Sequence, residues 1–319
     1  MNFFIQWSQL IESLNSSTFN CFNKILNLSI LMVQKVFTRV LIGALYLLSL
    51  LPFQLLYQLS DFIFLLLYKF PGYRKKVVQK NLKNSFPSKT NDELGKIEKE
   101  FYHFLADLMI ESVKLITTSR VQALKHFKIE NMDLLEGYFA QGKSIIAVSG
   151  HYGNWEMMNI LALDVKYQTN VVYKPLTNTL FDSFWNRVRS KFGATLVPMS
   201  KVLRHIASNR KNLSITLLVS DQTPSSPDAQ FYTQFLNQHT PVFTGVEKIA
   251  RSMNSPVVFC DITVIKRGYY SCKFVTIAED PSAFAENEIT LAHVAYLEGM
   301  INRNPQYWLW SHNRWKFNQ

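Results

Sequence analysis

A histidine and a glutamate lie in a short polar segment near the middle of the chain. The segment SGHYGNWE, residues 149–156, follows an apolar run that has the composition of a buried strand. His151 and Glu156 are five residues apart, a spacing that places two side chains on different faces of a regular helix. They can meet only if the chain turns between them, and Gly150 and Gly153 provide the backbone freedom for such a turn.

This arrangement is suited to general base catalysis. Asn154 is a favourable N-cap residue, so we expect a helix to begin there and to place Glu156 in its first turn. From that position Glu156 can bind one ring nitrogen of His151, which fixes the tautomer and leaves the other nitrogen to accept a proton. Backbone N–H groups at the helix start would be available to an oxyanion. Because a histidine at a strand end is also a common loop residue, the segment alone does not identify a catalytic site.

Other catalytic and ligand-binding motifs are absent from the sequence. Ser149 lacks the upstream glycine of a GxSxG nucleophile elbow. The HExxH, Walker A and GxGxxG patterns do not occur, so zinc, nucleotide-phosphate and dinucleotide sites lack their usual marks. The three cysteines form no CxxC pair and are too few for a disulfide framework, which favours a reducing compartment. We therefore predict a protein without a metal ion.

The N-terminal part of the chain has the pattern of a membrane anchor. Val40–Tyr57 is uncharged and marginally long enough to cross a bilayer, which takes about 20 apolar residues. Pro52 is expected to break this run, and a second apolar run, Phe62–Tyr68, is followed by a cluster of basic residues. Basic residues flank the apolar block on both sides, so a single span and insertion of two short helices into one leaflet remain open. A pair of core helices in a soluble protein is the alternative. We predict membrane-anchoring helices within residues 1–70 and a catalytic domain on the cytoplasmic side.

Helix and strand patterns alternate through the rest of the chain. The residues Thr90–Glu93 have the spacing of a capping box and predict the start of a long amphipathic helix that ends near Ile116. We expect strands at 127–130, 144–149, 170–173, 195–197, 213–219, 257–264 and 269–277, and further helices at 133–141, from 154, and at 179–192, 201–209 and 289–301. This alternation predicts one α/β domain, residues 71–319, with a largely parallel central sheet flanked by helices.

Three polar segments lie at the ends of predicted strands. These are the His151 segment, Lys174 with Pro175, and Ser220–Gln222. In parallel α/β sheets ligands bind outside the carboxyl ends of the strands, so we expect the three segments to converge on one site. Lysine and arginine number 34 against 23 aspartate and glutamate, an excess that favours anionic partners such as phospholipid headgroups, sugar phosphates, acidic carrier proteins or nucleic acid.

Several sequence blocks resemble one known family. GHYGNWE contains an H-x4-E pattern similar to the H-x4-D/E signature of glycerolipid-type acyltransferases. The other blocks are, in chain order, LLPFQLLYQLSDFIFLLLY, RKKVVQKNLKNSFP, VYKPLTNTLFD, VSDQTP, TPVFTG and WLWSHNRWKFN. Together they resemble the lauroyl/myristoyl acyltransferases of lipid A biosynthesis in Gram-negative bacteria, from about Val36 to the C-terminus.

The resemblance implies a glycerolipid acyltransferase-like fold and acylation of a hydroxyl group. His151 would be the general base and Glu156 its orienting partner. The acyl donor would be a thioester on acyl carrier protein, with no cofactor and no metal. The acceptor would be a lipid A precursor or another anionic glycolipid, at the bacterial inner membrane.

The resemblance also assigns a set of substrate-binding residues. Lys174 stands in a block where many members have arginine, and it would contact an acceptor phosphate as a point charge. For the others, turn chemistry or a packed C-terminal tail is an equally simple explanation. The residues expected to bind substrate are Asn154, Lys174, Asp221, Gln222, Arg314 and Lys316.

Other functions remain open at this level. The same chemistry would serve O- or N-acylation of a phospholipid or an aminolipid. A non-catalytic basic protein that binds membranes or nucleic acid is a second class, but the sequence contains no compact nucleic-acid-reading motif, so we predict no nucleic-acid partner. A serine hydrolase is the third, and it would require a covalent adduct on Ser149.

Overall fold

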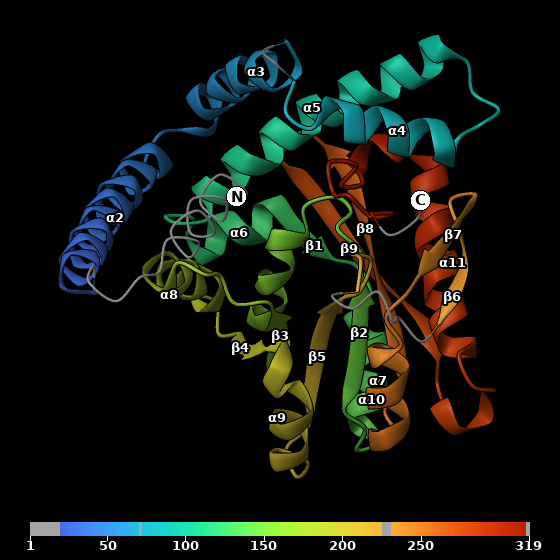
Figure 1. Ribbon diagram of the computed structural model, residues 1–319. Coiled ribbons are helices and arrows are strands. Elements are labelled where there is room, and N and C mark those ends of the chain that lie inside the picture. The colour runs from blue at the N-terminus through green and yellow to red at the C-terminus, as the bar shows by residue number, and fades with distance from the viewer. Residues whose placement is uncertain (1–19, 70–71, 225–230, 317–319) are drawn as a thin grey trace.

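A seven-stranded sheet forms the centre of the computed structural model, which describes residues 20–69, 72–224 and 231–316 (Figure 1). The strands are β1 (Phe127–Ile129), β2 (Ile145–Ser149), β3 (Gln168–Tyr173), β4 (Thr195–Pro198), β5 (Ser214–Val219), β8 (Val257–Lys266) and β9 (Tyr269–Ala278). Their order across the sheet is β1-β9-β8-β2-β5-β3-β4, and only the β8–β9 pair is antiparallel. The predicted α/β class with a largely parallel sheet is confirmed.

Helices cover both faces of this sheet. They are α4 (Lys75–Ser85), α5 (Asn91–Lys114), α6 (Arg120–His126), α7 (Met132–Ala140), α8 (Thr179–Ser190), α9 (Val202–Ser208), α10 (Gly245–Met253) and α11 (Glu288–Arg303). All five residues of β2 are buried, and alternate side chains enter different cores. Ile146 and Val148 pack with residues of α10 and α11, whereas Ile145 and Ala147 pack with residues of α7. A strand buried on both faces explains the continuous apolar run in the sequence.

Helix α5 is the longest of these helices. Its predicted capping box is confirmed, because the Thr90 side chain accepts from the backbone N–H of Glu93 and the Glu93 side chain accepts from that of Thr90. The buried side of α5 is not purely apolar, since Asp107 and Glu111 are 5% and 0% exposed. Helix α5 therefore brings two carboxylates into the interior, which only a set of polar partners can accommodate.

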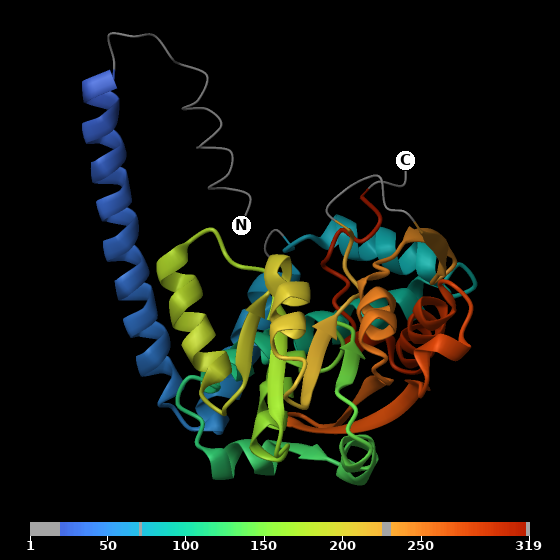
Figure 2. The same cartoon turned by 90° about the horizontal axis from the view of Figure 1, so that it is seen from below.

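Two further helices precede the sheet and the helices that cover it. Helix α2 (Asn20–Ser49) and helix α3 (Phe53–Lys69) are separated at Pro52, as predicted. In Figures 1 and 2, α2 lies along the edge of the molecule next to α8, and the Asn178 side chain donates to Thr38 Oγ1 at 2.9 Å. Within the described residues, one helical stretch, Met32–Ser49, is long and apolar enough to cross a membrane, and 11% of it is buried. Helix α3 packs on α5.

Some elements differ from the prediction. The structure has a separate two-stranded hairpin, β6 (Tyr232–Phe235) with β7 (Gln238–Pro241), that the sequence did not indicate. The helix expected from Asn154 is a 3₁₀ segment, η1 (Trp155–Leu163). The expected N-cap hydrogen bond is also absent, as described below.

Candidate active site

His151 lies in a five-residue loop, residues 150–154, between β2 and η1; we call it the His151 loop. Backbone hydrogen bonds fix the loop to the C-terminal segment, since Leu309 N donates to His151 O at 3.1 Å and Gly153 N donates to Tyr307 O at 3.0 Å. The backbone N–H of His151 also donates to Asp221 Oδ2 at 2.8 Å. The loop is therefore held by groups from two distant parts of the chain.

Asp221 is the partner of the His151 ring. Its Oδ1 lies 2.6 Å from His151 Nδ1, and its Oδ2 accepts from Trp308 Nε1 at 2.8 Å. Burial raises the pKa of this carboxyl, but the charge of His151 and its hydrogen bonds outweigh burial and bring the pKa down to about 2. An ionised Asp221 requires the proton of the neutral ring to be on Nδ1, which leaves the Nε2 lone pair as the basic site.

Gln222 covers that basic nitrogen. Its Nε2 lies 3.2 Å from His151 Nε2, so the amide donates to the ring lone pair. His151 has a side chain that is 19% exposed, against 3% for Asp221. A hydroxyl group can therefore approach Nε2 if it replaces the Gln222 amide. The structure thus brings together three of the predicted site residues, His151, Asp221 and Gln222.

Glu156 has a different partner from the one predicted. Its carboxylate forms a bidentate pair with Arg189 of α8, with Arg189 Nε 2.9 Å from Glu156 Oε2 and Arg189 Nη2 2.5 Å from Oε1. The expectation that Glu156 orients His151 is corrected, because Asp221 occupies Nδ1. Trp155, the residue before Glu156, packs edge-on against the His151 ring with centroids 5.0 Å apart.

Asn154 is buried and does not cap a helix. Its side chain is 0% exposed and makes no capping hydrogen bond. Instead Asn154 Nδ2 donates to Glu111 Oε2 at 2.7 Å. The Glu111 carboxylate is a strong acceptor for the amide N–H, so the Asn154 side chain turns inward and its oxygen does not reach the backbone N–H groups at the start of η1. The N-cap prediction is wrong, and the side chain lies too deep to reach a substrate at the surface.

The two glycines of the His151 loop are required by close packing. A Cβ on Gly153, which has a φ of +60°, would lie 2.7 Å from Ile262 Cγ2. A Cβ on Gly150 would lie 2.7 Å from Leu297 Cδ1 and 3.2 Å from Asp221 Oδ2. Glycine therefore lets the loop backbone pack closely against Ile262 at one position, and against Leu297 and Asp221 at the other, where a side chain would be too close to these neighbours.

Of the remaining predicted residues, two are exposed, whereas Arg314 is buried and lies near Asp221. Lys174 is exposed just beyond β3, and Lys316 is exposed near the C-terminus. Arg314 is 1% exposed, donates to Pro241 O, and lines a pocket of about 290 Å³ together with Asp221. Trp308 and Trp310 are buried. The C-terminal tryptophans thus form core and not an exposed wall for a phosphosugar.

Three residues of the site were not predicted from the sequence. Trp308 lies in the C-terminal block, whose tryptophans fit a packed tail or stacking on bases but do not indicate a hydrogen bond to Asp221. Arg189 has no recognisable signal on its amphipathic helix. Glu111 had one: it stands among buried apolar positions of α5, one turn after Asp107. Within the ranges that the structure describes, no group of three or more His, Cys, Asp or Glu side chains is arranged to hold a metal ion.

Comparisons with known proteins agree with the motif pattern. The family model described as bacterial lipid A biosynthesis acyltransferase matches residues 24–317. A lipid A biosynthesis palmitoleoyltransferase of Escherichia coli K12 is 22% identical over 277 residues, covering 86% of this chain and 89% of that protein. A lipid A biosynthesis acyltransferase of Haemophilus influenzae is 20% identical over 238 residues, covering 73% and 72%.

A solved structure is also similar. It is the 1-acyl-sn-glycerophosphate acyltransferase of Thermotoga maritima, 14% identical, with a TM-score of 0.36 over 78% of this chain and 95% of that one. The family match spans nearly the whole chain and includes the His151 loop. The chain therefore belongs to the bacterial lipid A biosynthesis acyltransferase family.

Proposed function

We propose that the protein transfers a fatty acyl group from acyl carrier protein to a hydroxyl of a lipid A precursor. The observation that carries this proposal is the His151–Asp221 pair at the carboxyl end of a central strand, in a chain of the lipid A acyltransferase family. An acyl transfer to a hydroxyl needs one base and no redox or metal chemistry, and this pair supplies the base.

The geometry of His151 supports the following reaction. The acceptor hydroxyl displaces the Gln222 amide and donates to Nε2. As its oxygen attacks the thioester carbonyl, Nε2 takes the proton, and Asp221 stabilises the resulting imidazolium through Nδ1. Collapse of the tetrahedral intermediate breaks the C–S bond, and the imidazolium returns the proton to the thiolate. The products are an ester and a free thiol, with no acyl-enzyme.

Glu156 has a supporting role in this proposal. Its bidentate pair with Arg189 ties the first turn of η1 to α8 and so fixes Trp155, which packs against the His151 ring. The same two residues border a pocket of about 230 Å³ whose other lining is mostly apolar. Loss of the pair would loosen one wall of the site without removing the base.

The N-terminal helices support a membrane location for this reaction. Large apolar side chains of α2 are exposed, among them Val33, Phe37, Val40 and Leu47, at 67%, 63%, 65% and 67%. On α3, Leu55, Phe62, Leu65 and Leu66 are also exposed. Such a surface fits contact with acyl chains. We propose that these helices hold the catalytic domain on the cytoplasmic side of the inner membrane, where a soluble acyl carrier protein meets a lipid acceptor. The net charge of +11 favours both the acidic carrier and a phosphorylated acceptor.

Product masses provide the test. The detergent-purified protein is incubated with a panel of acyl carrier protein thioesters and a tetra-acylated lipid A precursor, with His151→Ala in parallel. We expect a mass gain of one acyl group that the variant does not give, and the gain also identifies the preferred chain length. A His151-dependent product formed on a phospholipid or an aminolipid, and not on the lipid A precursor, would reject this acceptor. An equal product yield from His151→Ala would reject the mechanism.

A further inference from the structure

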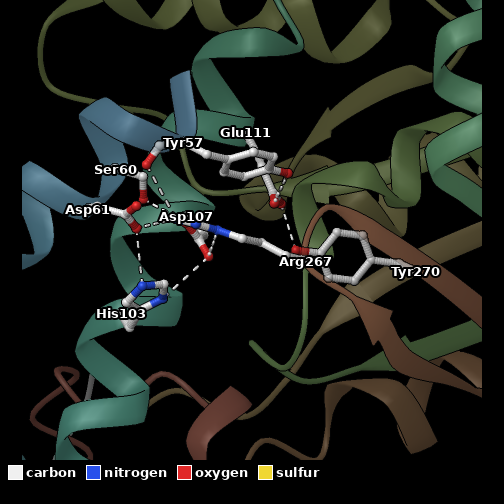
Figure 3. A network of polar contacts seen from close by, with 8 residues as sticks. All are labelled: Tyr57, Ser60, Asp61, His103, Asp107, Glu111, Arg267 and Tyr270. Carbon is white, nitrogen blue, oxygen red and sulfur yellow. Dashed lines mark hydrogen bonds and ion pairs between the residues drawn. The ribbon is translucent and has the colours of Figure 1, made fainter. Parts of the chain in front are cut away.

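A second carboxylate, Glu111 of α5, lies beneath the His151 loop. It is 0% exposed and belongs to the interior of the protein, where an ionisable group requires an explanation. Figure 3 shows it between α3, α5 and β9. Nothing in the proposed acyl transfer uses this residue directly.

Three neutral groups donate to Glu111, each from a different element. Tyr57 Oη of α3 donates to Oε1 at 2.9 Å, and Tyr270 Oη of β9 donates to Oε2 at 2.6 Å. Asn154 Nδ2 of the His151 loop donates to Oε2 at 2.7 Å. One carboxylate therefore joins the N-terminal helices, the sheet and the loop that carries the proposed base.

The charged groups around Glu111 are paired with one another. Arg267, in the turn between β8 and β9, donates to Asp107 of α5 and to Asp61 of α3 (Figure 3). His103 also lies within reach of both of these aspartates. Among the ion pairs of the described residues, none includes Glu111, and Asp107 is a like charge one turn away. Burial raises the pKa of Glu111 to about 7, and the charge of Asp107 adds a smaller increase. The three hydrogen bonds lower this pKa but do not outweigh burial.

The hydrogen bond to Asn154 acts on the geometry of His151. Asn154 ends the same five-residue loop, and Gly153 between them has a φ of +60° and a close contact with Ile262. The other end of the loop is fixed by Asp221 and Leu309. A short loop held at both ends transmits a displacement of Asn154 to the histidine ring, and a shift of about 1 Å at a reacting group costs about 10²-fold in rate.

We propose that Glu111 is a positioning residue. Its carboxylate holds Asn154, and through Asn154 also His151, at a fixed position relative to the anchor helix α3. The inference rests on the proposed acyl transfer for its kinetic readout. The proposal also implies that full activity requires α3 to be packed on α5, because α3 carries Tyr57, one of the three donors to Glu111.

Glutamine at this position imitates the protonated carboxyl. In Glu111→Gln the amide oxygen can accept from Asn154 and Tyr270, and the amide nitrogen can donate to Tyr57. The same partners remain in reach, but the charge-assisted hydrogen bond to Asn154 becomes a neutral one of about half its strength. Asn154 is then held less firmly, and we expect a loss of about fivefold in rate. Glu111→Leu removes all three hydrogen bonds.

The experiment compares acyl-transfer kinetics of the wild-type protein and the two variants between pH 5.5 and pH 8.5. For Glu111→Leu we expect kcat to fall about 10²-fold with little change in KM. For Glu111→Gln we expect the ratio of wild-type to variant kcat/KM to be about fivefold at pH 8.5 and to approach one as the pH falls through about 7. A pH effect that is common to both proteins cancels in this ratio. A ratio that is constant with pH, or a folded Glu111→Leu protein with wild-type kcat, would overturn the proposal.

A second measurement needs no acyl transfer. Diethylpyrocarbonate acylates accessible imidazole nitrogens, and the rate at His151 is read by peptide mass mapping without substrate. We expect the rate at His151 to change in Glu111→Leu while the rate at His205, on α9, stays the same. If the wild-type protein transferred no acyl group from any donor, the proposed function would fail, and this labelling would still decide the positioning role: equal His151 rates in the two proteins would overturn it.

Discussion

Asp221 and Glu111 are two buried carboxylates that hold opposite ends of the same loop, and their acidities differ widely. Each accepts three hydrogen bonds: Asp221 from the His151 backbone, the His151 ring and Trp308, and Glu111 from three neutral side chains. The pKa of Asp221 is about 2, whereas that of Glu111 is about 7. The number of hydrogen bonds therefore does not explain the difference.

The difference comes from the charge that each partner can carry. The His151 ring can be positive, and it stabilises the ionised form of Asp221 against the cost of burial. Glu111 has only neutral donors, so burial dominates. Asp221 is thus a permanent negative charge suited to an imidazolium, whereas Glu111 changes its charge near neutral pH while its position stays fixed.

The largest expected effect is the loss of the permanent charge. Asp221→Asn keeps the shape of the side chain, but its amide can donate to Nδ1 and so move the ring proton to Nε2, which removes the base. In serine proteases the equivalent change lowers kcat about 10⁴-fold, and we expect a loss of that order here. Steady-state kinetics with the preferred acyl donor measure it. Activity within tenfold of wild type would show that Asp221 does not set the tautomer.

The pH dependence of stability should separate the two carboxylates. The pKa of Glu111 is raised from 4.5 to about 7 in the folded protein, so the unfolded chain loses its proton first and stability falls as the pH rises through this window. The full cost is about 3 kcal/mol above pH 7. The stability that Asp221 contributes is present above pH 3.8 and is lost only as the pH falls through about 2, so it adds no slope in this range.

Thermal melts of wild type and Glu111→Gln measure this slope. Because the variant has no charge to bury, we expect its melting temperature to exceed that of wild type at pH 8 by on the order of 5 °C, and the two to converge near pH 5. A constant offset over this range would mean that the pKa of Glu111 is the same in the folded and the unfolded chain. Taken with the kinetic ratio, a variant that is more stable and less active would show that the charge is kept for function.

Glu156 is a third carboxylate, and its partner is a fixed cation. If Glu156 acts through Arg189, Glu156→Gln and Arg189→Gln should each lower kcat by about tenfold, and the double variant should be no worse than either, because one pair is lost in all three. The kcat values of the wild type and the three variants form a double-mutant cycle, which measures the coupling between Glu156 and Arg189. A much larger loss for Glu156→Gln alone would show that this carboxylate binds His151 during turnover, as the sequence predicts.

Most of the fold could be predicted from local patterns. The capping box at Thr90, the continuous apolar run of β2 and the break at Pro52 each follow from interactions among near neighbours. The sequence also predicted that three polar segments converge at strand ends. For the His151 and Asp221 segments the structure shows this convergence, since both follow neighbouring strands of a parallel sheet and their side chains are hydrogen-bonded.

The partner of His151 could not be predicted in this way. It depends on the register of β2 with β5, in which Ser149 is opposite Val219 and the residues after both strands become neighbours. Local reasoning considered Glu156 because it is near in sequence, whereas Asp221 is near in space. Asn154 does not cap the helix for the same reason. Its hydrogen-bond partner, Glu111, lies on a helix that ends forty residues earlier in the chain.

The smallest expected effect concerns the tie between α3 and Glu111. Gly268, in the β8–β9 turn, has a φ of +76°, and a Cβ there would lie 1.9 Å from Tyr57 Oη. Gly268→Ala should therefore displace Tyr57, while Tyr270 and Asn154 still donate to Glu111. Gly142→Ala is the matched control, because Gly142 has a φ of +71° and open space around its Cβ.

Both alanine variants carry the backbone cost of a positive φ, about 1 kcal/mol. Gly268→Ala should lose about 1 kcal/mol more, from the contact with Tyr57, and should lower kcat about threefold where the control does not. Thermal melts and acyl-transfer kinetics measure the two differences. If Gly268→Ala lost stability but kept the control's kcat, α3 would stabilise the body without influencing His151. If kcat fell and KM stayed constant, the Tyr57 hydroxyl would contribute to the position of the base, and the neutral partners of Glu111 would matter to catalysis as well as its charge.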